Sequence, residues 1–323
     1  MPANLVAIGG GTGLAVLLRG LKRHVGDELA DLAAVVTVSD DGGSSGRLRR
    51  ELGVLPPGDI RSCIVALASD EDLLTRLFQY RFPNGGGLSG HSFGNLLLTA
   101  LSGITGDFYQ AILTAESILS VRGRILPATL TDVRLHGVGA SGRRFEGESA
   151  VGLADEPLER VELEPGRVAA FPPAVEAIAE AHLVVLGPGS LYTSILPNLL
   201  IPEIREAIEA SRARVVLPLN LMTQPGETAG MTASDHLRAI EQHAGEDLVD
   251  VVLINERAVP EGVLAHYRAV GATPIEIDEK ALAGRGVEVR SADLLDEGEL
   301  IRHHPGRLSA EIVALLADGG RGE

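Results

Sequence analysis

The sequence reads LVAIGGGTGLAVLLRGL over residues 5–21, so that an apolar run precedes a glycine-rich turn and then apolar residues at helical spacing. This order predicts a strand, a tight turn and a helix, which is how nucleotide-binding α/β folds begin. Glycines let the backbone approach a ligand closely, and the amides at the start of a helix favour an anion such as phosphate. We therefore expect Gly10, Gly11, Thr12 and Gly13 to bind a phosphorylated ligand.

Further apolar runs follow along the chain, at 33–38, 183–186, 215–219 and 249–254, with weaker ones at 273–277 and 287–290. Short continuous runs of this kind are typical of parallel strands that are buried on both faces. Helical patterns separate them, and helices are predicted at 60–69, 71–80, 108–119, 201–210, 234–243 and 309–316. The expected fold is α/β, with a Rossmann-like, doubly wound and mostly parallel sheet.

The pattern of the sequence changes between about residues 122 and 170. Short strand-like pieces, beginning with 125–130, alternate there with Gly, Pro and Asp turns. This pattern predicts a small antiparallel β insertion. No repeat or long charged linker is visible in the sequence. We therefore expect residues 1–323 to form a single α/β nucleotide-binding domain that contains the insertion.

Composition excludes several classes of protein. The formal net charge of −16 argues against a nucleic-acid partner, and 3% aromatic residues leave little surface for stacking bases. The single cysteine, Cys63, permits neither a disulfide framework within the chain nor a cysteine-based zinc site, and we expect it to be buried. The sequence contains no signal peptide pattern and no apolar segment near the ~20 residues of a membrane span. These features predict a cytoplasmic protein.

Polar and glycine residues follow one apolar run after another. In open α/β sheets, ligands bind beyond the carboxyl ends of the strands, so these segments are the expected binding loops. The candidate ligand-binding residues in them are Asp40, Asp41, Ser44, His91, Asn95, Gly187, Gly189, Ser190, Thr193, Ser194, Asn220 and Thr223. Small hydroxyl, amide and glycine residues suit phosphates and sugar hydroxyls because they offer hydrogen bonds without bulk.

The adjacent carboxylates of Asp40 and Asp41 have two interpretations. They would hold Mg²⁺ beside a diphosphate, or they would form hydrogen bonds within a turn that leads to a helix. Asp59 and Arg61 follow a Pro-Pro-Gly turn, where they would serve either the site or a helix cap with a salt bridge. His91 would act as an acid or base, or would be structural. Asp40, Asp41 and His91 are thus the catalytic candidates.

Known nucleotide signatures do not identify the ligand. The dinucleotide fingerprint fails because Leu14 and Val16 stand where Gly or Ala is expected, and no Gly-Lys-Ser/Thr sequence completes a P-loop. Asp40 nevertheless stands where such folds often place a ribose-binding acid, so NAD stays open as a ligand. Gly187-Pro188-Gly189-Ser190-Leu191 is not the Gly-x-Ser-x-Gly elbow of a hydrolase.

Long motifs give the sequence a family resemblance. They are GGGTGL at 9–14, VSDDGGSSGRLR at 38–49, PPGDIR at 56–61, GHSFGN at 90–95, GPGSLYTS at 187–194 and NLMTQPGET at 220–228. Together they resemble the gluconeogenesis factor family (YvcK-like), a branch of the superfamily that contains 2-phospho-L-lactate transferase. The resemblance runs from residue 5 to at least residue 257.

The resemblance implies a bacterial cytoplasmic protein that binds UDP-sugars, notably UDP-N-acetylglucosamine, without a required cofactor and without demonstrated turnover. Such proteins support cell shape and wall synthesis during growth on gluconeogenic carbon sources, so cell-wall or morphogenesis proteins are the implied partners. Thr12 and Asn198 fall on positions that this branch would use for the UDP-sugar. We also expect a homo-oligomer.

The transferase branch implies an alternative. Its members bind a guanine nucleotide donor with Mg²⁺ and pass phospholactate to a deazaflavin, and Asp40 and Asp41 match the acidic pair that they would use for metal and acceptor. One segment departs from the family pattern, because His304 stands where Asp is usual in the Arg-His-Asp segment near the C-terminus. We expect His303 and His304 to be solvated, with Arg302 able to reach an anion.

Overall fold

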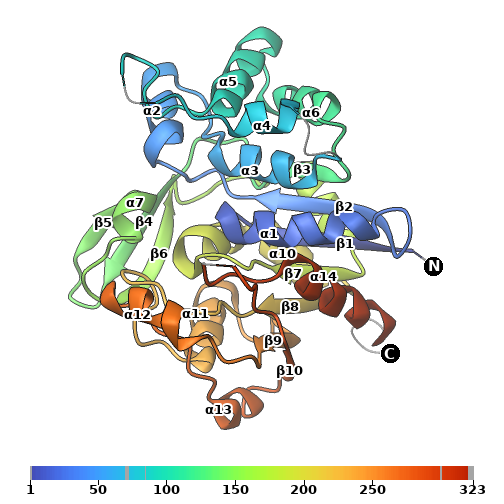
Figure 1. Ribbon diagram of the computed structural model, residues 1–323, viewed down its shortest axis with the longest axis vertical. Coiled ribbons are helices and arrows are strands. Elements are labelled where there is room, and N and C mark those ends of the chain that lie inside the picture. The colour runs from blue at the N-terminus through green and yellow to red at the C-terminus, as the bar shows by residue number, and fades with distance from the viewer. Residues whose placement is uncertain (1, 70–72, 84, 299, 319–323) are drawn as a thin grey trace.

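The structure of the protein is a computed structural model that describes residues 2–69, 73–83, 85–298 and 300–318 (Figure 1). In these residues a seven-stranded sheet has the order β10-β9-β8-β7-β1-β2-β3, and every neighbouring pair is parallel. Its strands are β1 (Ala3–Gly9), β2 (Leu29–Val36), β3 (Arg124–Pro127), β7 (Leu183–Leu186), β8 (Arg214–Pro218), β9 (Val251–Asn255) and β10 (Glu288–Ala292). The predicted doubly wound parallel sheet is confirmed.

Helices cover both faces of the sheet because alternate strand residues point to opposite sides. Leu5 and Ala7 pack in one buried cluster with the helices α1 (Gly11–Leu21), α3 (Gly58–Leu67), α6 (Phe108–Ile118) and α14 (Pro305–Ala314). Val6 and Ile8 pack in the other with α8 (Pro172–Ala179), α9 (Leu196–Leu199), α10 (Pro202–Ala210) and α11 (Ala233–Ala244). Cys63 is fully buried on the first face, as expected.

The remaining helices lie in the connections. They are α2 (Gly43–Leu52), α4 (Leu73–Gln79), α5 (Phe93–Thr105), α7 (Glu148–Val151), α12 (Glu261–Ala269) and α13 (Glu279–Ala283), with short helical turns η1 (Lys22–His24), η2 (Leu191–Ile195) and η3 (Leu315–Asp318). All six predicted helices are present with shifted ends. The first two residues of the helix predicted at 71–80 lie outside the described residues. No described helix is both long and apolar enough to cross a membrane.

The direction of winding reverses at β1. The chain runs outward from β1 through β2 to β3, then returns to the other side of β1 to place β7 and continues through β8 and β9 to β10. The carboxyl ends of β1 and β7 therefore flank a topological switch point, which is where open α/β sheets bind ligands. The glycine turn after β1 and the Gly187–Ser194 segment after β7 meet there.

A separate antiparallel sheet has the order β5-β4-β6 and forms the predicted insertion, at the left of Figure 1. Its strands are β4 (Arg134–Gly139), β5 (Arg144–Glu146) and β6 (Leu158–Glu164). One part of the prediction is wrong, because the piece at 125–130 is not part of this sheet. Ile125 and Leu126 are fully buried, and their strand β3 pairs in parallel with β2 at the edge of the main sheet.

The strand predicted at 273–277 is also wrong. The structure has no strand there and only an isolated bridge between Met222 and Pro274. A proline lacks the backbone N–H that a ladder needs, so pairing cannot propagate through this position. The run of residues instead lies against the 220–228 loop.

Candidate functional site

A cavity of about 520 Å³ lies at the switch point. Its lining comprises Gly10, Gly11, Thr12, Gly13 and Val16; Pro188, Gly189, Ser190 and Ser194; residues 220–225; Tyr267, Val270 and Ala272; and residues 301–303. A volume of this size is in the range of sites for small molecules and cofactors. The structure thus brings together glycine and polar residues from three of the predicted binding loops.

The glycine turn forms one side of the cavity. Helix α1 begins at Gly11 with no side-chain cap and no acidic residue in its first turn. The amides of a first helical turn have no partner within the helix, and the helix dipole makes this end attractive to anions. Gly11 has φ +65°, a left-handed conformation that favours glycine. The turn is therefore suited to bind a phosphate group.

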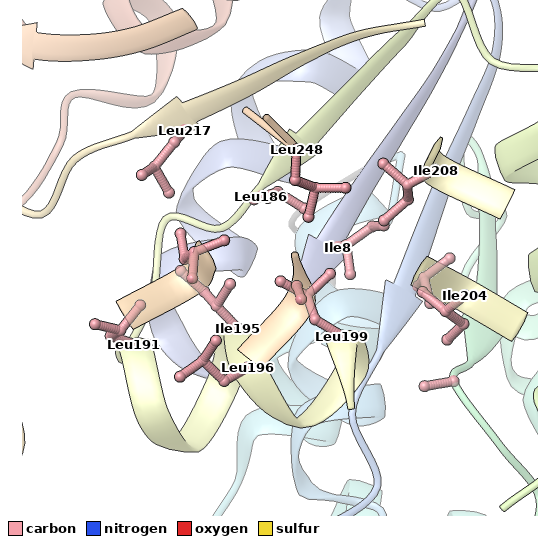
Figure 2. Close-up of a cluster of buried hydrophobic side chains, with 14 of the residues drawn as sticks. Ile8, Leu186, Leu191, Ile195, Leu196, Leu199, Ile204, Ile208, Leu217 and Leu248 are labelled. Atoms are coloured by element: carbon pink, nitrogen blue, oxygen red, sulfur yellow. The ribbon is translucent and has the colours of Figure 1, made fainter. Parts of the chain in front are cut away.

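The segment after β7 forms the facing wall. A side chain on Gly13 would overlap the carbonyl oxygen of Pro188, so the backbones of the two segments are in close contact at this point. Apolar side chains hold this wall in place: Figure 2 shows Ile195 and Leu196 in the same buried cluster as Ile8 and Leu186 of the sheet. The wall is consequently fixed to the strands on either side of the switch point.

The predicted donors on this wall have different roles. Ser190 and Ser194 line the cavity. Thr193 does not: its hydroxyl donates to Glu227 Oε1 at 2.9 Å, and the backbone N–H of Tyr192 donates to Glu227 Oε2 at 3.0 Å. Glu227, which the sequence reasoning missed although it quoted the motif, thus anchors the start of η2.

Asn198 is fully buried and is not among the residues that line the cavity. Its amide nitrogen lies 2.8 Å from the carbonyl oxygen of Ser194 and 3.4 Å from that of Gly9, to which it donates. Asn198 therefore joins the two walls beneath the cavity.

The 220–228 loop closes a third side. Asn220 lines the cavity and donates its amide to the carbonyl oxygen of Gly189 at 2.8 Å. Thr223 also lines it, and its hydroxyl accepts a hydrogen bond from the backbone of Thr273. Asn220 and Thr223 thus both belong to the cavity lining.

The other predicted residues form a separate polar cluster that does not line this cavity. Asp40 accepts a hydrogen bond from the backbone of Gly42, and Asp41 accepts one from the hydroxyl of Ser149. Ser44 lies 2.9 Å from Nδ1 of His91, and both are buried. The amide oxygen of Asn95 accepts a hydrogen bond from Arg61, so the predicted binding residues divide into two groups.

Asp59 connects the two groups. It lies inside the first turn of α3 and caps nothing, because Pro57 occupies the cap position without a side-chain bond; the helix-cap interpretation was wrong. Its carboxylate instead accepts a hydrogen bond from the backbone of Gly11. A side chain on Gly10 would overlap the same carboxylate. Asp59 thus lies directly behind the glycine turn.

Several carboxylates lie near one another around Asp59. Burial and the charge of Asp40 raise the pKa of Asp59 to about 7, against the lowering effect of the Gly11 amide. Burial and the charges of Asp59 and Asp40 raise the pKa of Glu148 well above its usual range. Glu148 comes from the insertion, accepts a hydrogen bond from Ser39, and was missed by the sequence reasoning. Asp59 and Glu148 therefore bind protons at neutral pH more readily than ordinary carboxylates do.

The charge of Asp59 gives a prediction for stability. A raised pKa means that the folded state prefers the protonated carboxyl, so the charge costs stability progressively as pH rises from about 4 toward 7. Asp59→Asn should therefore raise the free energy of unfolding at pH 8, and should raise it less at pH 5. Urea unfolding at both pH values measures this difference.

Asp27→Asn, at an exposed turn, is the matched control and should change neither curve. An Asp59→Asn variant that is equally stabilised or equally destabilised at the two pH values contradicts the prediction.

The C-terminal segment differs from expectation. His303 is not solvated, since it is 7% exposed and lines the cavity, while His304 accepts a hydrogen bond from the backbone of Arg307 as the cap of α14. Arg302 is exposed and also lines the cavity. The packing of α14 on α1 carries this segment to the site, and no local pattern around His303 indicated it.

The described residues contain no group of three or more His, Cys, Asp or Glu side chains placed to hold a metal ion. A cation at Asp40 and Asp41 would therefore need further ligands, such as phosphate oxygens of a bound molecule.

Comparison with known proteins identifies the family of the chain. Residues 5–295 match the model of the family described as 2-phospho-L-lactate transferase CofD. The gluconeogenesis factor of Bacillus subtilis is 44% identical over 98% of this chain and 98% of its own length. The gluconeogenesis factor of Halalkalibacterium halodurans is 48% identical over 96% of this chain and 95% of its own.

A solved structure extends the comparison to three dimensions. The crystal structure of a member of the UPF0052 family from Bacillus halodurans has a TM-score of 0.93 and 47% identity, and the match covers 97% of this chain and all of that one. The fold and the sequence match over most of the chain agree, and the chain belongs to the CofD family, within which its relatives include the gluconeogenesis factors.

Proposed function

We propose that the protein binds a UDP-sugar, with UDP-N-acetylglucosamine as the first choice, in the 520 Å³ cavity at the switch point. The observation that carries the proposal is the meeting of the first turn of α1 with the Ser190 and Ser194 wall in one cavity. Such a site offers backbone amides to a diphosphate and hydroxyl and amide groups to the attached rings. The resemblance to the gluconeogenesis factors supports the choice of nucleotide.

In this proposal the glycine turn contacts the diphosphate. Thr12, Ser190 and Ser194 add hydroxyl groups, while Asn220 and Thr223 face the uridine or the sugar. Gly189 lines the second wall without a side chain, while Gly187, with φ +83°, lies outside the cavity lining. Thr193 and Asn198 act on the ligand indirectly, because their hydrogen bonds hold η2 and the end of β1 in place.

The activity that we propose is regulatory. A UDP-sugar that binds one conformation better than another shifts the population and so changes the affinity for a partner protein. Partners in cell-wall synthesis or morphogenesis, a cytoplasmic location and a homo-oligomeric state belong to this proposal. Support for cell shape during growth on gluconeogenic carbon sources is the cellular role that follows.

An enzyme is the second candidate, and the carboxylates of the polar cluster favour it. Asp59 contacts the glycine turn, the charges of Asp40, Asp41 and Asp59 act on Glu148, and the family model bears the name of a transferase. Carboxylates such as Asp40 and Asp41 suit Mg²⁺, but the described residues offer no group of three or more such ligands. The ligand's own phosphates would therefore complete the site. When bound, Mg²⁺ would offset the charge of a diphosphate leaving group.

A thermal-shift titration tests the two candidates. UDP-N-acetylglucosamine, UDP-glucose, GDP and NAD are each added with and without Mg²⁺. A ligand at about 100 times its dissociation constant stabilises the folded state by about 2.7 kcal/mol, which should raise the melting temperature by several degrees. We expect this increase with the UDP-sugars, and we expect it to persist without Mg²⁺.

A response to GDP alone that requires Mg²⁺ would make the transferase the primary candidate, and assays of acceptors would follow. The absence of any response to UDP-sugars at millimolar concentration contradicts the proposed function.

A further inference from the structure

One wall of the cavity carries a buried nitrogen atom without a partner. His303 is 7% exposed and lines the cavity, and in the described part of the chain its Nε2 has no hydrogen-bond partner. A buried polar atom left unpaired is costly, so such an atom in a cavity wall indicates a group that a ligand completes.

The rest of the imidazole fixes what Nε2 can do. The backbone of Leu219, directly after β8, hydrogen-bonds the ring and favours the protonated imidazole, so the ring donates to the carbonyl oxygen there. Burial lowers the pKa of His303 to about 4, which keeps the ring neutral at physiological pH. A neutral imidazole has one donor and one acceptor nitrogen. With the donor engaged by Leu219, Nε2 is the acceptor.

The segment that carries the ring is itself held in place. The backbone of Arg302 accepts a hydrogen bond from Asp296 at 2.8 Å, and the backbone of His304 donates to Leu294 at 2.7 Å. The backbone on both sides of His303 is therefore fixed, and the hydrogen bond to Leu219 orients the ring.

A second unpaired acceptor lines the same cavity. The amide nitrogen of Gln224 donates to the hydroxyl of Ser190 at 2.8 Å, while its buried Oε1 has no partner among the described residues. One part of the cavity lining thus presents amides at the first turn of α1, and another part presents acceptors.

We propose that His303 Nε2 and Gln224 Oε1 accept hydrogen bonds from O–H or N–H groups of the bound molecule, and so select its uncharged ring. This inference rests on the proposed function and deepens it. A phosphate has only acceptors at neutral pH and cannot satisfy these atoms, so it belongs at the glycine turn. The matching donors are the hydroxyl and acetamide groups of a pyranose or the imide N–H of uracil.

The test is calorimetric binding of UDP-N-acetylglucosamine and of UDP to matched variants. His303→Phe keeps the size of the ring and removes the acceptor, so it should weaken UDP-N-acetylglucosamine binding by about tenfold. His303→Gln places an acceptor oxygen near the position of Nε2 and should recover most of the affinity. His266→Phe, at an exposed position of α12 outside the cavity lining, should bind as the wild type does.

The two ligands distinguish the source of the donor. A loss confined to UDP-N-acetylglucosamine assigns the acceptor to the pyranose, and an equal loss with UDP assigns it to the nucleoside; both support the inference. A His303→Phe variant that binds both ligands as tightly as the wild type overturns the inference and leaves the proposed function standing. A wild-type protein that binds neither ligand contradicts both the inference and the proposed function.

A second measurement avoids any folding defect of the variants. In the wild-type protein, the ¹⁵N resonance of His303 Nε2 should move when UDP-N-acetylglucosamine saturates the site. A resonance that stays at its unbound position in the saturated complex overturns the inference.

Discussion

Gly13→Ala should lower the affinity for UDP-N-acetylglucosamine by more than about tenfold and the stability by about 1–3 kcal/mol. The new methyl group would overlap the carbonyl oxygen of Pro188 and lie 3.0 Å from the Cα of Gly189. Both obstacles are backbone atoms, which cannot rotate aside as a side chain does. The glycine turn and the facing wall must therefore move apart, which misplaces the amides that we propose bind the diphosphate. Calorimetric titration and urea unfolding measure the two effects.

Gly103→Ala is the matched control for this substitution. Gly103 lies within α5, and an added methyl group there meets nothing within 4 Å. Alanine is favoured over glycine inside a helix, so this variant should gain up to about 1 kcal/mol in stability and keep the wild-type affinity. Wild-type affinity in Gly13→Ala would show that the contact between the two walls does not shape the site.

Glu227→Ala should reduce the free energy of unfolding by about 2–4 kcal/mol. The carboxylate is 7% exposed and accepts hydrogen bonds from the backbone of Tyr192 and the hydroxyl of Thr193. Its removal leaves both donors buried without an acceptor and opens a void beside η2. Because η2 carries Ser194 into the cavity, ligand affinity should fall as well. Urea unfolding and calorimetry check the two consequences.

Glu227→Gln separates the hydrogen bonds from the charge. The amide oxygen can accept from Tyr192, and the hydroxyl of Thr193 can reverse to accept from the amide nitrogen. Burial raises the pKa of Glu227, so the fold gains little from its negative charge. Glu227→Gln should therefore lose less than half of what Glu227→Ala loses. Equal losses in the two variants would mean that the charge, and not the hydrogen-bond geometry, stabilises η2.

The sequence was most informative where a local pattern has a local cause. The apolar run of β1 and the glycines after it predicted the strand, the turn and the start of α1, because backbone conformation and side-chain periodicity depend on neighbouring residues. The same reasoning placed β7, β8 and β9. It failed at 273–277, where Pro274 interrupts an otherwise suitable pattern.

Contacts between residues that are far apart along the chain could not be predicted from the sequence. The hydrogen bond from Ser39 to Glu148 spans 109 positions, and the one from Asn198 to Gly9 spans 189. Neither partner carries a local signal of the other. The burial of His303 likewise depends on the packing of the C-terminal segment near α1, and its own neighbours in the sequence are polar.

By itself, then, the sequence determined the alternation of strands and helices and the position of the glycine turn, since both follow from local conformation and spacing. Only the tertiary structure divided the polar motifs between the cavity and the polar cluster, placed Thr193 and Asn198 outside the cavity lining with protein hydrogen-bond partners, and raised the pKa of Asp59. The physical reason is that desolvation and charge interaction depend on distances in space, which the chain sets only when β1 and β7 lie side by side.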